Sequence, residues 1–157
     1  MTWKNPEKWA QMKSGETCPT CSDIPLEENK LSYLVEELKK SYVRLPKNQN
    51  YYGWVIVFFK RHVSELYELS NDERNEYMKE VSSVAEAVSK VFGAVKMHYL
   101  SFGSLCPHLH FHILPRQVED DPHHAIKMDE AETFLSDEEY KEIVEQLKEK
   151  IDFYIEN

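Results

Sequence analysis

The stretch that decides the fold is Pro107-His108-Leu109-His110-Phe111-His112-Ile113-Leu114-Pro115-Arg116. Histidine alternates with an apolar residue here, which is the two-residue period of a β-strand with one buried face. We therefore expect Leu109, Phe111 and Ile113 to face a core and the three histidines to form one row on the opposite face. Neighbours in such a row lie roughly 6.6 Å apart along a strand.

A row of histidines is costly as packing alone, because each imidazole needs a hydrogen-bond partner and histidine is not a strong strand former. The alternative is a purely structural histidine face, in which neighbouring groups satisfy the hydrogen bonds of each ring. Two adjacent histidines could share a metal ion. Three that converged on one zinc ion, with bonds of about 2 Å, would strain a straight strand. We therefore expect the row to divide its roles.

Composition indicates one catalytic domain over residues 1–157. The chain is 41% hydrophobic, which is enough for one core, and its 28 acidic and 19 basic residues argue against a surface that coats nucleic acid. No run approaches the roughly 20 apolar residues of a membrane span, and the first six residues open no signal-peptide core. We expect a cytoplasmic protein with a small ligand. An odd count of three cysteines favours a reducing compartment over a disulfide framework.

Periodicity predicts an α+β fold with an antiparallel, meander-like sheet. We expect strands over 43–45, 53–59 and 96–102, a segment over 31–38 that mixes both periods, and a loop over 46–50. A helix capped by Ser70 and Glu73 should run to Phe92. Residues 1–17 form an N-terminal arm with a short helix after Pro6. Residues 119–157 form an extension whose last helix buries Ile143, Leu147, Ile151 and Tyr154.

The motif Cys18-Pro19-Thr20-Cys21 has the spacing of redox dithiols, of zinc sites and of chance pairs. A redox dithiol would open a helix, whereas Pro25 and polar residues follow here, so we favour zinc. Structural zinc takes four ligands, and the chain also offers His62 and His108. His62 could equally be a polar residue at a helix start. We expect Cys106 to be a small buried hydrophobe.

The string His108-Leu109-His110-Phe111-His112-Ile113-Leu114 resembles the signature of the histidine triad (HIT) family, and the segment from Gly53 to Leu66 is also similar. The resemblance covers roughly residues 18–118. It implies a HIT-like fold, a homodimer in which the sheets of two subunits join, and a nucleotide hydrolase or transferase that acts at the α-phosphate. Zinc-bearing members resemble this chain in their ligand pattern, which implies one structural zinc per subunit on Cys18, Cys21, His62 and His108.

The same resemblance implies that His110 is the nucleophile of a covalent nucleotidyl-imidazole intermediate. His112, on the same face, would donate to the phosphate or to the bridging oxygen. Dinucleoside polyphosphates and nucleoside phosphoramidates are the implied substrates.

The chain departs from the family at one position. Many members carry a glutamine four residues before the first histidine, and this chain has Ser104 there. Ser104 is either a shorter phosphate donor or a plain turn residue. Arg116 either reaches a distal phosphate or caps a strand end.

Two other functional classes remain open from the sequence. In one, the histidine row is a catalytic zinc site that activates water, and a chelator would inactivate the enzyme quickly. In the other, the protein binds nucleotides without turnover, as the missing glutamine allows. Binding of adenosine monophosphate without hydrolysis of any conjugate would support that class.

Overall fold

The structure is a computed structural model, and it describes residues 4–128 and 132–156, so the first three residues of the expected arm and residue 157 lie outside it. Among the described residues, five strands form one antiparallel sheet in the order β1-β2-β3-β5-β4. The strands are β1 (Ser32–Glu37), β2 (Ser41–Pro46), β3 (Val55–Phe59), β4 (Lys96–Leu100) and β5 (His110–Arg116). The predicted α+β class is confirmed.

The sheet is a meander only as far as β3. The long helix α3 (Asn71–Phe92) then carries the chain across the sheet to its edge, where β4 forms, and β5 returns between β3 and β4. The histidine strand is therefore an inner strand with a partner on each side. The segment 31–38 is a strand, and the register shift between Leu34 and Glu36 explains why its sequence mixes two periods.

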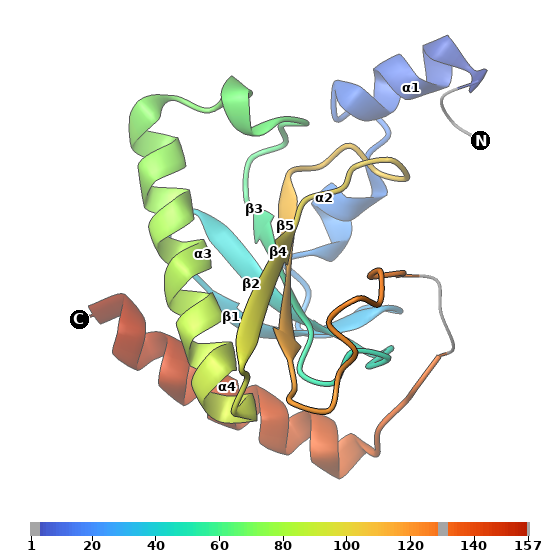
Figure 1. Cartoon of the computed structure of the whole chain (residues 1–157). Coiled ribbons are helices and arrows are strands. Elements are labelled where there is room, and N and C mark those ends of the chain that lie inside the picture. The colour runs from blue at the N-terminus through green and yellow to red at the C-terminus, as the bar shows by residue number, and fades with distance from the viewer. Residues whose placement is uncertain (1–3, 129–131, 157) are drawn as a thin grey trace.

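Both long helices pack on one face of the sheet, as Figure 1 shows for α3 and for α4 (Asp137–Glu156). The short helices α1 (Pro6–Lys13) and α2 (Pro19–Asp23) and the 3-10 turn η2 (Leu66–Glu68) lie near the end of the sheet where β5 begins. Nowhere in residues 4–128 and 132–156 is a helix both long and apolar enough to cross a membrane.

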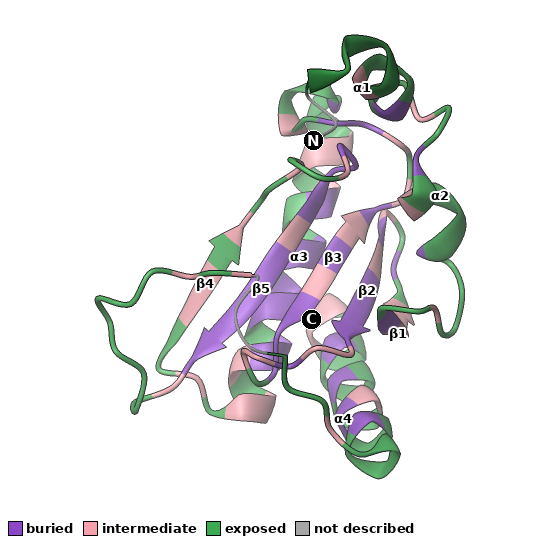
Figure 2. Cartoon of the chain, turned by 90° about the vertical axis from the view of Figure 1, so that its right-hand side faces the viewer, coloured by how far each residue is buried: buried purple, intermediate pink, exposed green. Residues whose placement is uncertain are grey.

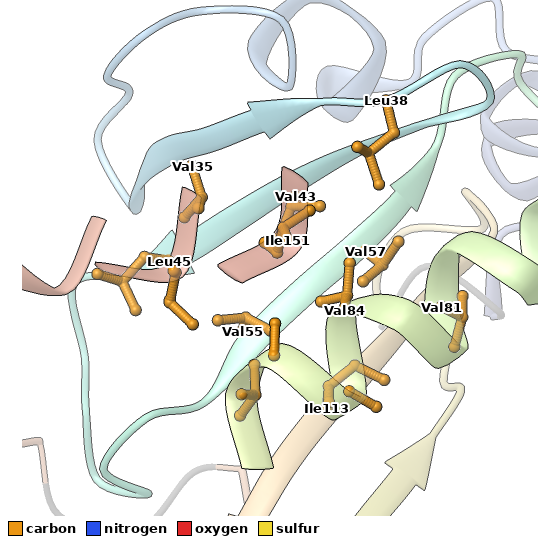
Figure 3. Packing of buried hydrophobic residues seen from close by; sticks show 14 of the residues in the cluster. Val35, Leu38, Val43, Leu45, Val55, Val57, Val81, Val84, Ile113 and Ile151 are labelled. Atoms are coloured by element: carbon orange, nitrogen blue, oxygen red, sulfur yellow. The ribbon is translucent and has the colours of Figure 1, made fainter. Parts of the chain in front are cut away.

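The core fills the space between the sheet and these two helices (Figure 3). Each fully buried aliphatic side chain contributes about 1.5–3 kcal/mol to folding. The predicted face of α4 is confirmed at three positions, since Ile143, Leu147 and Ile151 are buried, while Tyr154 is half-buried. The members contributed by the central strands include Val43, Leu45, Val55, Val57 and Ile113.

The predicted cap of α3 is confirmed. The Ser70 hydroxyl accepts a hydrogen bond from the Glu73 amide at 3.2 Å, and the Glu73 carboxylate accepts one from the Ser70 amide at 3.0 Å. The Tyr77 hydroxyl then donates to the Val57 carbonyl at 2.7 Å, which fixes the helix on β3. Because the helices cover one face, the alternate residues of β3 and β5 remain on the other face and are free to form a site.

Candidate active site and metal centre

The histidine strand begins later than the alternation predicts, at His110 and not at His108. Pro107 has no amide proton, and the His108 amide donates to the Cys106 carbonyl at 2.9 Å, so the chain turns before it joins the sheet. The predicted faces are otherwise confirmed. Leu109 and Ile113 lie in the core and Phe111 packs against it, so the alternate residues His110 and His112 lie on the opposite face of β5. Figure 2 shows β5 between β3 and β4.

The His110 ring is oriented by its own backbone. Its Nδ1 lies 2.6 Å from the His108 carbonyl oxygen. A carbonyl oxygen only accepts, so Nδ1 carries the proton and the neutral ring keeps a lone pair on Nε2. This Nε2 lies 3.0 Å from Nε2 of His112.

Trp54 fixes the other ring. Its indole Nε1–H donates to Nδ1 of His112 at 3.2 Å. Because indole only donates, the neutral His112 carries its proton on Nε2 and donates to Nε2 of His110. The site therefore presents a lone-pair nitrogen and an N–H group side by side, which pairs a potential nucleophile with a hydrogen-bond donor.

Burial keeps both rings neutral. It lowers the pKa of His110, and it lowers the pKa of His112 to about 3, with the positive charge of a protonated His110 adding to the shift. At neutral pH the lone pair on His110 is thus available for attack.

The cysteine pair and two histidines meet at the end of the sheet. The ligand atoms of Cys18, Cys21, His62 and His108 all lie within 4.8 Å of one another. The Cys21 Sγ lies 3.3 Å from Nδ1 of His62 and 3.5 Å from Nδ1 of His108, and the Cys18 Sγ lies 3.7 Å from the latter. Tetrahedral zinc, with bonds near 2.3 Å to sulfur and 2.1 Å to nitrogen, separates such atoms by about 3.6 Å.

The outer contacts of the cluster also suit a metal ion. Nε2 of His62 donates to the Lys13 carbonyl at 3.0 Å, and Nε2 of His108 donates to the Phe59 carbonyl at 2.7 Å, so each ring turns its Nδ1 lone pair toward the sulfurs. Burial lowers the pKa of His108 to about 4 and raises the pKa of Cys21 to about 12, with Cys18 adding to the second shift. A divalent cation would favour the thiolates that burial disfavours.

Two expectations about the cysteines are wrong. The motif does open a short helix, because Cys18 is the N-cap of α2 and Cys21 is its third residue. Cys106 is half-buried, and its Sγ lies 3.6 Å from the Cys18 Sγ and 3.0 Å from the Thr20 hydroxyl. The turn before His108 brings Cys106 beside the cluster.

The structure places the two remaining candidate residues, Ser104 and Arg116, at different ends of the sheet. Ser104 is exposed in the loop between β4 and β5 and lines a hollow that also borders Ser101 and Phe102. Arg116 lies at the far end of β5, about 20 Å from His110 along the strand, and pairs with the Asp120 carboxylate at 2.8 Å. The structure does not bring Arg116 to the triad.

A larger cavity of about 670 Å³ opens on the β3 side of the triad. Trp54, Ile56 and Phe58 line it, and the Phe58 ring lies 5.1 Å from that of His110. Arg44 is fully buried at its edge and donates to the Ile24 carbonyl and to Ser32, which holds the 24–32 segment as a wall. This size and apolar lining suit a nucleoside.

Residues 27–119 match the HIT domain family. The chain belongs to this family. Solved structures of other HIT proteins are similar along most of their length. A histidine triad protein of Bradyrhizobium japonicum has a TM-score of 0.70 and 23% identity, covering 76% of this chain and 90% of that one. A hypothetical histidine triad nucleotide-binding protein of Sulfolobus tokodaii has a TM-score of 0.68 and 26% identity, covering 87% and 93%.

A third HIT structure, from Mycobacterium smegmatis, is zinc-bound, with a TM-score of 0.63 and 16% identity, and covers 90% of this chain and 97% of that one. At such identity the likeness concerns the fold. No curated protein matches the chain.

Proposed function

We propose that this HIT protein is a nucleotide hydrolase or nucleotidyl transferase that attacks the α-phosphate of a nucleotide conjugate through His110. The observation that carries the proposal is the pairing of the His110 Nε2 lone pair with the Nε2–H of His112 at 3.0 Å. Membership of the HIT family supports the same chemistry. The conjugates we expect are dinucleoside polyphosphates and nucleoside phosphoramidates.

The reaction proceeds in two displacements. Nε2 of His110 forms a bond to the α-phosphorus while the bond to the leaving group breaks, and the leaving group departs with that electron pair. The Nε2–H of His112 donates a hydrogen bond to the departing atom and stabilises the charge that develops there, and the departing group takes any proton that it needs from solvent. The His108 carbonyl, which accepts from Nδ1 of His110, stabilises the positive charge on the nucleotidyl-imidazole. Water then forms a bond to phosphorus as the bond to Nε2 of His110 breaks, loses a proton to solvent and releases the nucleoside monophosphate.

We propose one structural zinc ion per subunit on Cys18, Cys21, His62 and His108. When bound, it would supply folding energy and no chemistry, since four protein ligands close a tetrahedral site. The ring of His108 would belong to the zinc site while its carbonyl orients His110. The metal cluster would in this way stabilise the geometry of the nucleophile.

We propose that Ser104 donates a hydrogen bond to the phosphate, in place of the glutamine that many family members carry.

We also propose a cytoplasmic homodimer. The edge strand β4 offers an unpaired side for a second sheet, and Tyr99 on it is about half exposed. Light scattering after size-exclusion chromatography that gives a monomer mass would exclude the dimer.

The function is tested by incubating the zinc-loaded protein with diadenosine polyphosphates and adenosine 5′-phosphoramidate and measuring released adenosine monophosphate. We expect His110→Ala to reduce release by at least a thousandfold, and His123→Ala, at an exposed loop position, to leave it unchanged. Binding of adenosine monophosphate without any turnover by the wild type would contradict the proposal and favour a nucleotide-binding protein.

A further inference from the structure

A second hollow, of about 350 Å³, lies beside the loop between β4 and β5, and Ser101, Phe102 and Ser104 of that loop line it. The Ser101 hydroxyl on its wall donates to the His110 carbonyl at 2.9 Å, and the Phe102 ring lies 5.5 Å from that of His112. On the β3 side, the larger cavity is lined by Trp54, which donates to His112, and by Phe58, whose ring lies 5.1 Å from that of His110. Ser104 lines the smaller hollow and Leu105 lines the larger cavity. A conjugate that reacts between the two has its nucleoside in the larger cavity and its leaving group in the smaller one.

The outer wall of this smaller hollow is the helix α1, which contributes Trp9 and Lys13 and lies outside the matched HIT domain. The end of α1 is held by the metal cluster, because the Lys13 carbonyl accepts the Nε2–H of His62 at 3.0 Å. Gly15 allows this approach, since a Cβ there would lie 3.0 Å from Cγ of His62. The position of the Lys13 side chain is thus tied to the zinc ligands and not left to a free terminus.

Lys13 is the cation of this hollow, and Glu65 is its carboxylate. Lys13 is exposed, and among residues 4–128 and 132–156 no carboxylate lies within 4.0 Å of its ammonium group. Ser101 and Ser104 add hydroxyl groups to the same wall. Ser104 is shorter than the glutamine that many HIT proteins have at this position, so the hollow has room for a phosphate that meets the lysine.

We propose that the hollow between α1 and the β4–β5 loop binds the leaving group, and that Lys13 favours leaving groups that carry phosphate over neutral amines. This inference rests on the proposed function, since it names the substrate class of the same site. A departing nucleoside diphosphate gains negative charge as its bond to the α-phosphorus breaks, and a cation beside it stabilises that charge. A departing ammonia carries no phosphate and gains no such stabilisation from a cation.

The test compares kcat/KM for two substrates that share one adenosine 5′-phosphoryl group, diadenosine triphosphate and adenosine 5′-phosphoramidate. We expect Lys13→Ala to lower kcat/KM for the first by about tenfold, Lys13→Glu to lower it further, and both to leave the second within about twofold. Lys13→Arg should retain both activities. Lys8→Ala, on the same helix but outside the hollow, is the matched control and should change neither.

Zinc content of each variant, measured by elemental analysis, should equal that of the wild type, because only the Lys13 backbone contacts His62. Equal losses on both substrates, or equal effects of Lys13→Ala and Lys8→Ala, would overturn the role of Lys13 and leave the proposed function intact. A wild-type protein that turns over neither substrate would overturn the proposed function and this inference with it.

Discussion

At the scale of single residues, the chemistry depends on which ring nitrogen of each histidine carries the proton. Trp54 sets this for His112, because its indole N–H donates to Nδ1. Trp54→Phe keeps an aromatic ring but removes the donor, so both tautomers of His112 become accessible. We expect kcat to fall by about tenfold, or about 1.4 kcal/mol. Nitrogen-15 NMR of His112 should show a mixed tautomer. A pure Nε2–H tautomer with unchanged kcat would contradict this role of Trp54.

The two buried rings also predict a pH profile. Acid protonates Nε2 of His110 and removes the lone pair of the proposed nucleophile, but burial lowers the pKa of His110 and that of His112. A lowered pKa means that the neutral, active form persists to lower pH than for an exposed imidazole near 6.5. We expect kcat/KM for a diadenosine polyphosphate at pH 6 to stay within about twofold of its value at pH 7. An acid limb with its midpoint at pH 6.5 or above would be inconsistent with rings held neutral.

The sequence predicted the histidines and the cysteine pair, because alternation and close spacing are local patterns. It missed Trp54, Arg44 and Lys13, which reach the site only through the register of the sheet and the position of α1. The sequence did not predict a role for Trp54, because both faces of β3 are apolar. Without polar residues that alternate with apolar ones, the segment from Gly53 to Phe59 does not show which of its residues share a face with His112. The pairing of Ile56 with His112 shows that Ile56, and with it Trp54 and Phe58 two positions away, lie on the triad face.

At the scale of elements, two glycines with positive φ provide a matched pair. Gly15 has φ +88° and a Cβ there would meet the His62 ring at 3.0 Å, whereas Gly93 has φ +63° with no atom of the described residues within 4 Å of such a Cβ. Alanine at either position strains the backbone by about 1 kcal/mol. We expect only Gly15→Ala to weaken zinc binding as well, because it displaces His62.

Chemical denaturation and competition with a zinc-binding dye measure the two effects. Equal zinc affinity in Gly15→Ala and Gly93→Ala would show that the packing of Gly15 on His62 does not support the metal cluster.

The order of the elements was only partly predictable. Caps, periods and the long helix are local, and the structure confirms them. The placement of β5 between β3 and β4 is not a local property. It depends on α3, which carries the chain across the sheet so that β4 forms at the edge. The same crossing makes the histidine strand internal, so that β3 and the loop after β4 supply walls on either side of the triad.

At the scale of the whole molecule, the cluster of Cys18, Cys21, His62 and His108 joins the N-terminal segment, the chain after β3 and the triad. We expect one zinc per subunit, and we expect Cys21→Ser to lose it with a fall in Tm of several degrees. Cys106→Ser is the control, since Cys106 touches Cys18 but lies outside the four-residue cluster. Elemental analysis and thermal denaturation measure both. Zinc retained in Cys21→Ser and lost in Cys106→Ser would mean that the ligand set is wrong.

The central claim is that His110 attacks phosphorus directly, and the stereochemical outcome at the α-phosphorus tests it most directly. Each in-line displacement inverts phosphorus, so two displacements retain its configuration and one attack by water inverts it. The substrate is an adenosine conjugate with one sulfur-substituted α-phosphate of known configuration, hydrolysed in oxygen-18 water. We predict retention of configuration in the released thiophosphate. Inversion would contradict the covalent mechanism and would assign the attack to water.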